Sequence, residues 1–392
     1  MGVRVAMEVS IAAAEAAKLA DVDVIAAYPI TPQTHIVEHL AELVADGELD
    51  AEYVPVESEH SALSACIGSS AAGARTFTAT CAQGLALMHE ILFIASALRT
   101  PIVMMVVNRA LSAPINIWND HSDIMAERDC GWIQTFAENG QEVFDLTLHA
   151  FRVAEDHRVL LPIMVNLDGF ILSHMIEPID IPEKEEVRRY LPEFKPAMRL
   201  DPDRPISMGP VGIPEVYTEA KKQLDEALVA SKGPIIQAWD EFGKIFGRHY
   251  KPVETYRCED AEVLLLTMGS ISETAMTAVD IMREKGVSVG LIRLRLWRPF
   301  PLDELRAAVK GADTLAVVDR AVSTGGPGGP VCSEVRSALF GLPNRPKVLG
   351  FIAGLGGRDV TLEMFEEMVN QSIEYAKEGK EQFYELVGVR EL

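Results

Sequence analysis

Short apolar runs alternate with amphipathic stretches through the first part of the chain. The runs are rich in β-branched residues, which is typical of buried strands, and the stretches between them have helical spacing. This alternation predicts a mostly parallel sheet covered by helices on both faces. The expected strands are DVIAAYP, AEYVPVE, ARTFTATC, PIVMMVVNR and RVLLPIMVNLD, and the expected helices include 5–19, 34–45, a small-residue helix after ESEH, GLALMHEILFIASALR and 145–156.

A change of composition separates this pattern from a second one. Residues 179–214 are dense in proline and charge, and we interpret them as a connecting arm over the first domain, followed by a helix-rich stretch. A second α/β pattern then runs to the C-terminus, with AEVLLLTMGS, VSVGLIRLRL, TLAVVDR and KVLGFIAGLG as strands and helices as the closing elements. The sequence therefore predicts two doubly wound, mostly parallel α/β domains, 1–252 (with the arm from about 179) and 253–392.

Composition narrows the class of protein. The 392 residues carry 58 acidic against 36 basic side chains, a formal charge of -22 with no basic run, which disfavours nucleic acid as a partner. No segment has the roughly 18 uninterrupted apolar residues of a membrane helix, and Glu8 and Glu15 favour an amphipathic helix over a signal peptide at the N-terminus. The cysteines lack C-x-x-C spacing, which argues for reduced thiols in the cytoplasm and against a local zinc or iron–sulfur site: Cys66, Cys81, Cys130, Cys258 and Cys332.

Polar residues gather where the predicted strands of the first domain end. Ligands of open α/β sheets bind beyond the carboxyl ends of the strands. We therefore expect one site that combines a hydroxyl, a carboxylate, an amide and a guanidinium. The strand ends are YPITPQT (28–34), ESEH (57–60), TCAQG (80–84), NRAL (108–111) and NLDG (166–169).

Each candidate side chain also has a structural interpretation. Thr31 alone is best explained as a helix cap, and Glu59 serves equally well as a ligand of helix N-terminal amides or as a functional carboxylate. Arg109 follows an apolar run, where its fork suits a substrate carboxylate, although an ion pair is the alternative. His60 is expected to be a hydrogen-bonded residue at the start of a helix.

Three other segments carry weaker signals. The polar loop 113–129 contains His121 and Asp123, but it lacks convincing third and fourth metal ligands, so an ordered lid or a subunit contact is expected. The glycine-rich segments 323–330 and 354–360 do not have the P-loop pattern, and we interpret both as tight structural turns.

These motifs together resemble a known family. In order along nearly the whole chain, the segments YPITPQT, ESEH with AAGARTFTATCAQGLALM, VNRAL, NDHSDIMAERDCGW, RPFP and GLGGRDV are similar to the α subunit of the 2-oxoacid:ferredoxin oxidoreductases, most closely the multi-subunit pyruvate enzymes. The resemblance implies a pyrimidine-binding-type domain for thiamine diphosphate followed by a transketolase C-terminal-like domain. It also implies oxidative decarboxylation of pyruvate with coenzyme A to acetyl-CoA and CO2, with electrons passed reversibly to ferredoxin.

The resemblance also implies roles for individual residues. Glu59 takes the position of the carboxylate that hydrogen-bonds the aminopyrimidine ring of thiamine diphosphate, and Pro29 lies in the same cofactor-binding segment. Arg109 and Thr31 match the positions that hold the carboxylate and carbonyl region of the 2-oxoacid, so Glu59, Arg109 and Thr31 are the expected catalytic residues. Glu57 is then a structural neighbour, and no metal ligand is expected on this chain.

One missing motif implies partner chains. Thiamine enzymes bind the diphosphate through Mg²⁺ with a Gly-Asp-Gly motif, which this sequence lacks. The resemblance therefore implies that the site is shared with a β subunit and that Mg²⁺ and the 4Fe–4S clusters lie on partner chains. The expected assembly contains β, γ and δ subunits, with ferredoxin docking on another subunit. Two alternatives stay open: another 2-oxoacid (2-oxoisovalerate, 2-oxoglutarate or oxalate), or a non-catalytic scaffold subunit.

Overall fold

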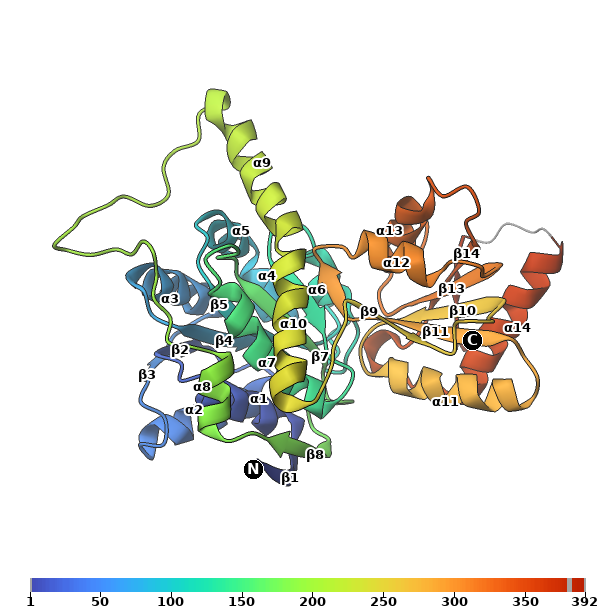
Figure 1. Cartoon of the computed structure of the whole chain (residues 1–392), viewed down its shortest axis with the longest axis horizontal. Coiled ribbons are helices and arrows are strands. Elements are labelled where there is room, and N and C mark those ends of the chain that lie inside the picture. Colours follow the sequence, from blue (N-terminus) through green and yellow to red (C-terminus); the bar gives the residue numbers. More distant parts are fainter. Residues whose placement is uncertain (1, 379–382, 391–392) are drawn as a thin grey trace.

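The computed structural model describes residues 2–378 and 383–390, which form two α/β lobes side by side (Figure 1). The elements up to the connection between the lobes are β1 (Val3–Glu8), α1 (Val9–Leu19), β2 (Val24–Ala27), α2 (Thr34–Ala45), β3 (Glu52–Pro55), α3 (Glu59–Ala72), β4 (Thr76–Thr80), α4 (Ala82–Leu87), α5 (His89–Ala97), β5 (Ile102–Asn108), α6 (Ser122–Ala126), β6 (Ile133–Phe136), α7 (Gly140–Ala154), β7 (Ile163–Asp168), β8 (Ile176–Ile181), α8 (Lys184–Tyr190), α9 (Pro214–Ala230) and α10 (Lys232–Phe246).

The remaining elements belong mainly to the second lobe. They are β9 (Val253–Tyr256), β10 (Val263–Thr267), α11 (Ile271–Glu284), β11 (Val289–Leu294), β12 (Leu296–Arg298), α12 (Leu302–Ala308), β13 (Thr314–Asp319), α13 (Pro330–Leu339), β14 (Lys347–Ile352), a 3₁₀ turn η1 (Leu355–Gly357), α14 (Leu362–Glu378) and β15 (Glu385–Leu386).

The first lobe is built on a seven-stranded sheet in the order β12-β6-β7-β5-β4-β2-β3. All neighbours run parallel except β12, which pairs antiparallel with β6. Every residue of the central strand β5 is buried, and its side chains alternate between two cores. Val103, Met105 and Val107 pack in the core that contains α1, α2 and α7, whereas Met104 and Val106 face α3, α4 and α5. The predicted parallel sheet with two covered faces is therefore confirmed.

The second lobe repeats this architecture with a six-stranded sheet in the order β15-β14-β13-β10-β11-β9. Only β9 runs antiparallel to its neighbour. Helices α11 and α14 pack on one face, while α12 and α13 pack on the other in a core that continues into the first lobe. Both predicted doubly wound domains are present. The predicted closing helices correspond to α14, and residues 379–382 and 391–392 lie outside the described part of the chain.

Some predicted elements were wrong in detail. The predicted helix 5–19 begins only at Val9, because residues 3–8 form β1 and pair antiparallel with β8. Helix α7 begins at Gly140, not at 145, because the Asn139 side chain accepts a hydrogen bond from the backbone N–H of Glu142 and so caps it. Strands β6 and β12 had no counterpart in the prediction. Although β12 lies in the second half of the sequence, it pairs with β6 as the outermost strand of the first sheet.

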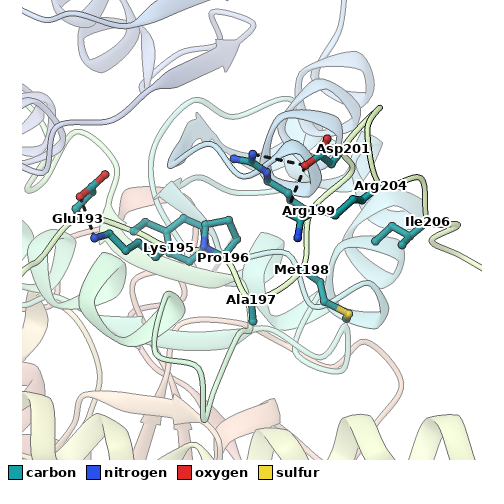
Figure 2. Close-up of a pocket in the computed structure, with 10 residues that line it drawn as sticks. Glu193, Lys195, Pro196, Ala197, Met198, Arg199, Asp201, Arg204 and Ile206 are labelled. Atoms are coloured by element: carbon teal, nitrogen blue, oxygen red, sulfur yellow. Dashed lines mark ion pairs between the residues drawn. The ribbon is translucent and has the colours of Figure 1, made fainter.

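The connecting segment forms an arm on the outside of the first lobe. Residues 191–213 have no regular structure, and the helix that follows, α9, projects from the body and contains no buried residue (Figure 1). Figure 2 shows the pocket that the arm lines, with a volume of 510 Å³, in which Arg199 and Arg204 both pair with Asp201. These arginines are exposed, so the pairs contribute little to stability. The N–H of Leu200 donates to Ala71 O and ties the arm to the end of α3.

All five cysteines are free, in agreement with the predicted reduced thiols. Burial raises the pKa of the Cys66 thiol to about 12, which makes it unreactive. Among the helices of the described residues, none has the length and apolar character needed to cross a membrane.

Candidate active site

The predicted strand ends meet at the carboxyl edge of the first sheet. Arg109, directly after β5, donates from Nη1 to the carbonyl oxygen of Thr31 at 2.8 Å. The thiol of Cys81, directly after β4, donates to the same oxygen at 3.1 Å. The backbone N–H of Gly169 donates to Asn108 O at 3.0 Å, which brings the end of β7 beside β5. Segments that are far apart in the sequence therefore form one site.

Glu59 is a buried carboxylate at the start of helix α3. Ser58 caps the helix by accepting from the N–H of Ser61, and Glu59 is its first residue, 6% exposed. Within the part of the chain that the structure describes, neither carboxylate oxygen of Glu59 has a hydrogen-bond partner. A buried carboxylate is normally paired or hydrogen-bonded, so an unpaired one indicates a place for a ligand.

Helix α4 packs directly against this carboxylate. Gly84 approaches so closely that a Cβ built there would lie 2.7 Å from Glu59 Oε1 and 2.5 Å from Thr80 Oγ1. Next to it, the hydroxyl of Thr80 and both side-chain polar atoms of Gln83 are buried without hydrogen-bond partners in the described residues. The end of β4 and the start of α4 thus carry unpaired polar groups, and the Thr80 hydroxyl lies beside Glu59 where Gly84 packs against both.

Glu57 and His60, for which structural roles were expected, differ in their contacts. Glu57 accepts a hydrogen bond from the Ser61 hydroxyl at the surface, and this hydrogen bond lowers the pKa of Glu57. His60 lies in the first turn of α3, and its carbonyl oxygen accepts from the Ser64 hydroxyl.

Arg109 is held rigidly at the carboxyl end of the central strand β5. It is 6% exposed, and its Nε donates to Asn116 O at 2.8 Å while Nη1 donates to Thr31 O. No carboxylate pairs with its guanidinium among the described residues, so the structural ion pair that we considered is not what holds it. Its Nη2 group has no hydrogen-bond partner within the described chain and remains available for a ligand.

Asp123 belongs to the site, and the sequence analysis did not predict its structural role there. Its carboxylate is buried and accepts from the backbone N–H groups of Arg109 and Ala82, both at 3.0 Å, and from Asn108 Nδ2 at 3.1 Å. Burial raises the pKa of Asp123 to about 6, although these donors oppose the shift. Asp123 therefore ties the end of β5 to the start of α4; the sequence offered it only as a weak metal ligand.

Thr31 is exposed in a loop that enters helix α2. The position before the helix is Gln33, and no side chain caps it, so the interpretation of Thr31 as a helix cap was wrong. Gln33 instead donates to Ala79 O at 2.6 Å and fixes the loop on β4. The Thr31 hydroxyl has no partner among the described residues, and Pro29 is exposed two positions earlier.

The loop 113–129 makes an ordered contact with the second lobe of the same chain, and the group of potential metal ligands found among the described residues does not include it. His121 Nε2 lies 2.8 Å from Asp168 Oδ1, and Asp168 in turn accepts from Arg320 Nη1 at 2.7 Å. Burial raises the pKa of Asp168, but the charges of Arg320 and His121 and their hydrogen bonds lower it more, to well below its usual range. The contact joins the lobes immediately beside the site.

One group of potential metal ligands was not predicted. Glu8 in β1, His35 in α2 and His174 in the turn before β8 each place one ligand atom within 4.8 Å of the other two. His35 Nδ1 is hydrogen-bonded to Glu8 Oε1 at 2.7 Å. This hydrogen bond explains the proximity of two of the three residues without a metal ion.

Comparisons with known proteins agree with this geometry. Residues 15–243 match "Pyruvate flavodoxin/ferredoxin oxidoreductase, thiamine diP-bdg", and residues 261–365 match "Pyruvate:ferredoxin oxidoreductase core domain II". Pyruvate synthase subunit PorA of Methanocaldococcus jannaschii is 54% identical over 92% of this chain and 92% of its own length. Ketoisovalerate oxidoreductase subunit VorA of Pyrococcus horikoshii is 45% identical over 94% of this chain and 93% of its own.

A solved structure supports the fold. The 2-oxoglutarate:ferredoxin oxidoreductase from Magnetococcus marinus superposes with a TM-score of 0.72 at 20% identity, covering 94% of this chain and 65% of that chain. The family match covers more than half of the sequence, and the relatives match it almost from end to end. The chain therefore belongs to the pyruvate flavodoxin/ferredoxin oxidoreductase family.

Proposed function

We propose that this chain is the α subunit of a thiamine-diphosphate-dependent pyruvate:ferredoxin oxidoreductase. The observation that carries the proposal is the buried, unpaired carboxylate of Glu59 in a segment that matches a thiamine-diphosphate-binding family. The substrate follows from relatives called pyruvate synthase subunit, 54% identical in the example above. The overall reaction converts pyruvate and coenzyme A into acetyl-CoA and CO2, and two electrons pass to ferredoxin.

The residues around Glu59 fit the aminopyrimidine end of thiamine diphosphate. The ring carries both donors and acceptors, and Thr80 and Gln83 offer donors and acceptors without partners in the described residues, next in the chain to the glycine that packs on Glu59. Glu59 would hold the ring nitrogen through a shared proton, and Pro29 would line the same face. When bound, thiamine diphosphate supplies the carbon nucleophile that attacks the 2-oxoacid and accepts the electron pair released with CO2.

Arg109 and Thr31 are suited to orient the substrate. Arg109 keeps Nη2 free while Nε and Nη1 fix the plane of its guanidinium, so the arginine presents a preorganised charge to a carboxylate. The Thr31 hydroxyl lies on the loop that Arg109 contacts, where it can donate to the carbonyl oxygen of the 2-oxoacid. Holding that oxygen stabilises the negative charge that develops on it during addition.

The rest of the site is proposed to come from partner chains. The absence of Gly-Asp-Gly from the sequence supports a β subunit that binds the diphosphate through Mg²⁺. The 4Fe–4S clusters, and with them the docking site for ferredoxin, belong to partner chains because the five cysteines here are scattered and mostly buried. The complex contains β, γ and δ subunits and works in the cytoplasm.

The substrate is tested by dye reduction with the purified complex. Pyruvate, 2-oxoisovalerate and 2-oxoglutarate are compared with coenzyme A present, and oxalate with and without it. We expect the highest kcat/KM with pyruvate. A kcat/KM at least about tenfold higher with another acid, equivalent to about 1.4 kcal/mol, would move the assignment to that acid. The 45% identity to a ketoisovalerate oxidoreductase subunit makes 2-oxoisovalerate the strongest competitor.

A further inference from the structure

The glycine turn of the second lobe reaches the loop that holds Arg109. Asn116 Nδ2 donates to Gly356 O at 3.1 Å, and Asn116 O accepts from Arg109 Nε at 2.8 Å. Asn116 Oδ1 also accepts from the N–H of Trp118 at 2.6 Å. One asparagine thus links the second lobe to the proposed substrate-binding arginine, through its side chain on one side and its backbone on the other.

A second link starts from the same glycine. The N–H of Gly356 donates to Asp120 Oδ2 at 3.2 Å, and Asp120 Oδ1 accepts from the N–H and the hydroxyl of Ser122 at 2.9 and 2.6 Å. Ser122 Oγ in turn accepts from the N–H of Leu111, two residues after Arg109. The peptide groups of Gly356 therefore hold the loop at two points, Asn116 and Asp120, each linked by hydrogen bonds to the segment 109–111.

The close approach explains why this turn is made of glycines. Gly356 and Gly357 have φ angles of 59° and 80°, which favour glycine. A Cβ at Gly356 would overlap Asn116 Nδ2, and a Cβ at Gly357 would overlap the Trp118 side chain. The turn is therefore shaped to receive the loop, which goes beyond the tight structural turn that the sequence suggested.

The frame behind the loop is rigid. The N–H of His121 donates to Arg320 O at 2.8 Å, and Arg320 Nη2 donates to Asn119 Oδ1 at 2.5 Å. Arg320 is itself buried and paired with Asp168. Because the second lobe is fixed here, a displacement of its glycine turn is transmitted to Asn116 and is not absorbed by relative movement of the lobes.

We propose that the second lobe positions Arg109 for the reaction through the hydrogen bond between Asn116 and Gly356. Asn116 is a positioning residue, since it contacts Arg109 and not the reacting atoms. This inference rests on the role proposed for Arg109. The second lobe then contributes to substrate selection and turnover although its sequence carries none of the proposed catalytic residues.

The test uses the purified complex with Asn116→Asp, Arg109→Lys and the double variant. Asn116→Asp keeps an oxygen for Trp118 but replaces the donor to Gly356 O with an acceptor. We expect kcat/KM for pyruvate to fall by about tenfold to a hundredfold, as for a small misplacement of a binding group. The rate of exchange of the thiazolium C2 proton, which depends on Glu59, should stay within about twofold of the wild-type rate. A general loss of structure would instead lower both this rate and kcat/KM.

The double variant separates the possible failures. If Asn116 acts through Arg109, adding Asn116→Asp to Arg109→Lys lowers kcat/KM by no more than about twofold further. If Arg109→Lys lowers kcat/KM but Asn116→Asp leaves it unchanged, this inference is overturned while the role of Arg109 stands. The same conclusion follows if the effects of the two substitutions add in the double variant. A normal kcat/KM for Arg109→Lys overturns both this inference and the proposed role of Arg109.

A glycine pair covers the case in which Asn116→Asp prevents assembly. Gly356→Ala pushes a methyl group onto Asn116, whereas Gly325→Ala adds one at a similar φ of 76° with nothing within 4 Å. Both variants place an alanine at a positive φ, so each carries backbone strain. If kcat/KM falls in Gly356→Ala but not in Gly325→Ala, the inference is supported. Equal effects of the two variants contradict it.

Discussion

Glu59 joins two properties that folded proteins rarely combine, burial and the lack of a hydrogen-bond partner. The residue as a whole is 6% exposed, but its carboxylate oxygens are not among the fully buried unpaired atoms of the described residues, so they keep some accessible surface. Gly84 packs against Glu59 Oε1 without supplying a side-chain donor, and no other donor of the described residues reaches the carboxylate. A ligand bound in the working complex would complete the hydrogen bonds that this carboxylate lacks.

Glu59→Gln in the assembled complex tests this role. A glutamine keeps the shape but cannot share a proton with the pyrimidine ring as a carboxylate does. We expect exchange of the thiazolium C2 proton to slow by at least about a hundredfold, the size of a general acid–base contribution. The exchange is measured by NMR after mixing with D2O. Glu57→Gln, two residues away at the surface, is the control and should exchange normally; near-normal exchange in Glu59→Gln would end the assignment.

The sequence revealed the residues whose position is set locally. Arg109 directly follows β5 and Glu59 begins the helix that follows β3, so recognising each strand also located the side chain. Asp123 could not be placed in this way, because its partners Arg109 and Ala82 meet it only after the loop 113–129 has folded back. Asn116 looked like an ordinary loop residue, since its partner Gly356 lies 240 positions away.

At the scale of the elements, helices α3 and α4 enclose the candidate cofactor site. Small residues let α3 lie close to β2 and β4, and the Cys81–Gly84 turn starts α4 against Glu59. Strand β12 was not predicted because the run VSVGLIRLRL looks continuous, while the structure divides it between two sheets after Leu294. Its pairing with β6 depends on the packing of the two lobes, which no local pattern encodes.

Gly84→Ala tests the close packing between these helices. The added methyl group would lie 2.7 Å from Glu59 Oε1, so either the carboxylate or α4 has to move. We expect slower C2 proton exchange and a free energy of unfolding lower by about 1–3 kcal/mol, as for an overpacked core. Gly68→Ala in α3 is the control: nothing lies within 4 Å there, and alanine should stabilise the helix by up to about 1 kcal/mol. Unchanged exchange in Gly84→Ala would show that Glu59 does not need this glycine.

At the scale of the whole molecule, one of the hydrophobic cores contains residues of both lobes, and a buried ion pair crosses their interface. Asp168 and Arg320, 1% and 2% exposed, pair across the interface, and the backbone N–H and the side chain of Ser270 also donate to Asp168. The position of Asp168 was predicted with the other strand ends, but its partners come from the second domain. The pair explains how the second lobe is fixed firmly enough to position the loop 113–129.

Arg320→Met should weaken this interface in a manner that depends on pH. Removing the guanidinium leaves Asp168 buried without its main counter-charge, which costs about 3–5 kcal/mol of unfolding free energy at pH 7. In the wild type the pKa of Asp168 is below its usual range, so the stabilisation is complete above about pH 4 and is lost as the pH falls further. In the variant, burial raises that pKa, so the carboxyl takes up a proton as the pH falls from 7 and the deficit should shrink toward pH 4.5. Urea unfolding of the full chain at both pH values, with exposed Arg345→Met as the control, measures this difference. An equal deficit at the two pH values would mean that the loss comes from packing and not from the charge of Asp168.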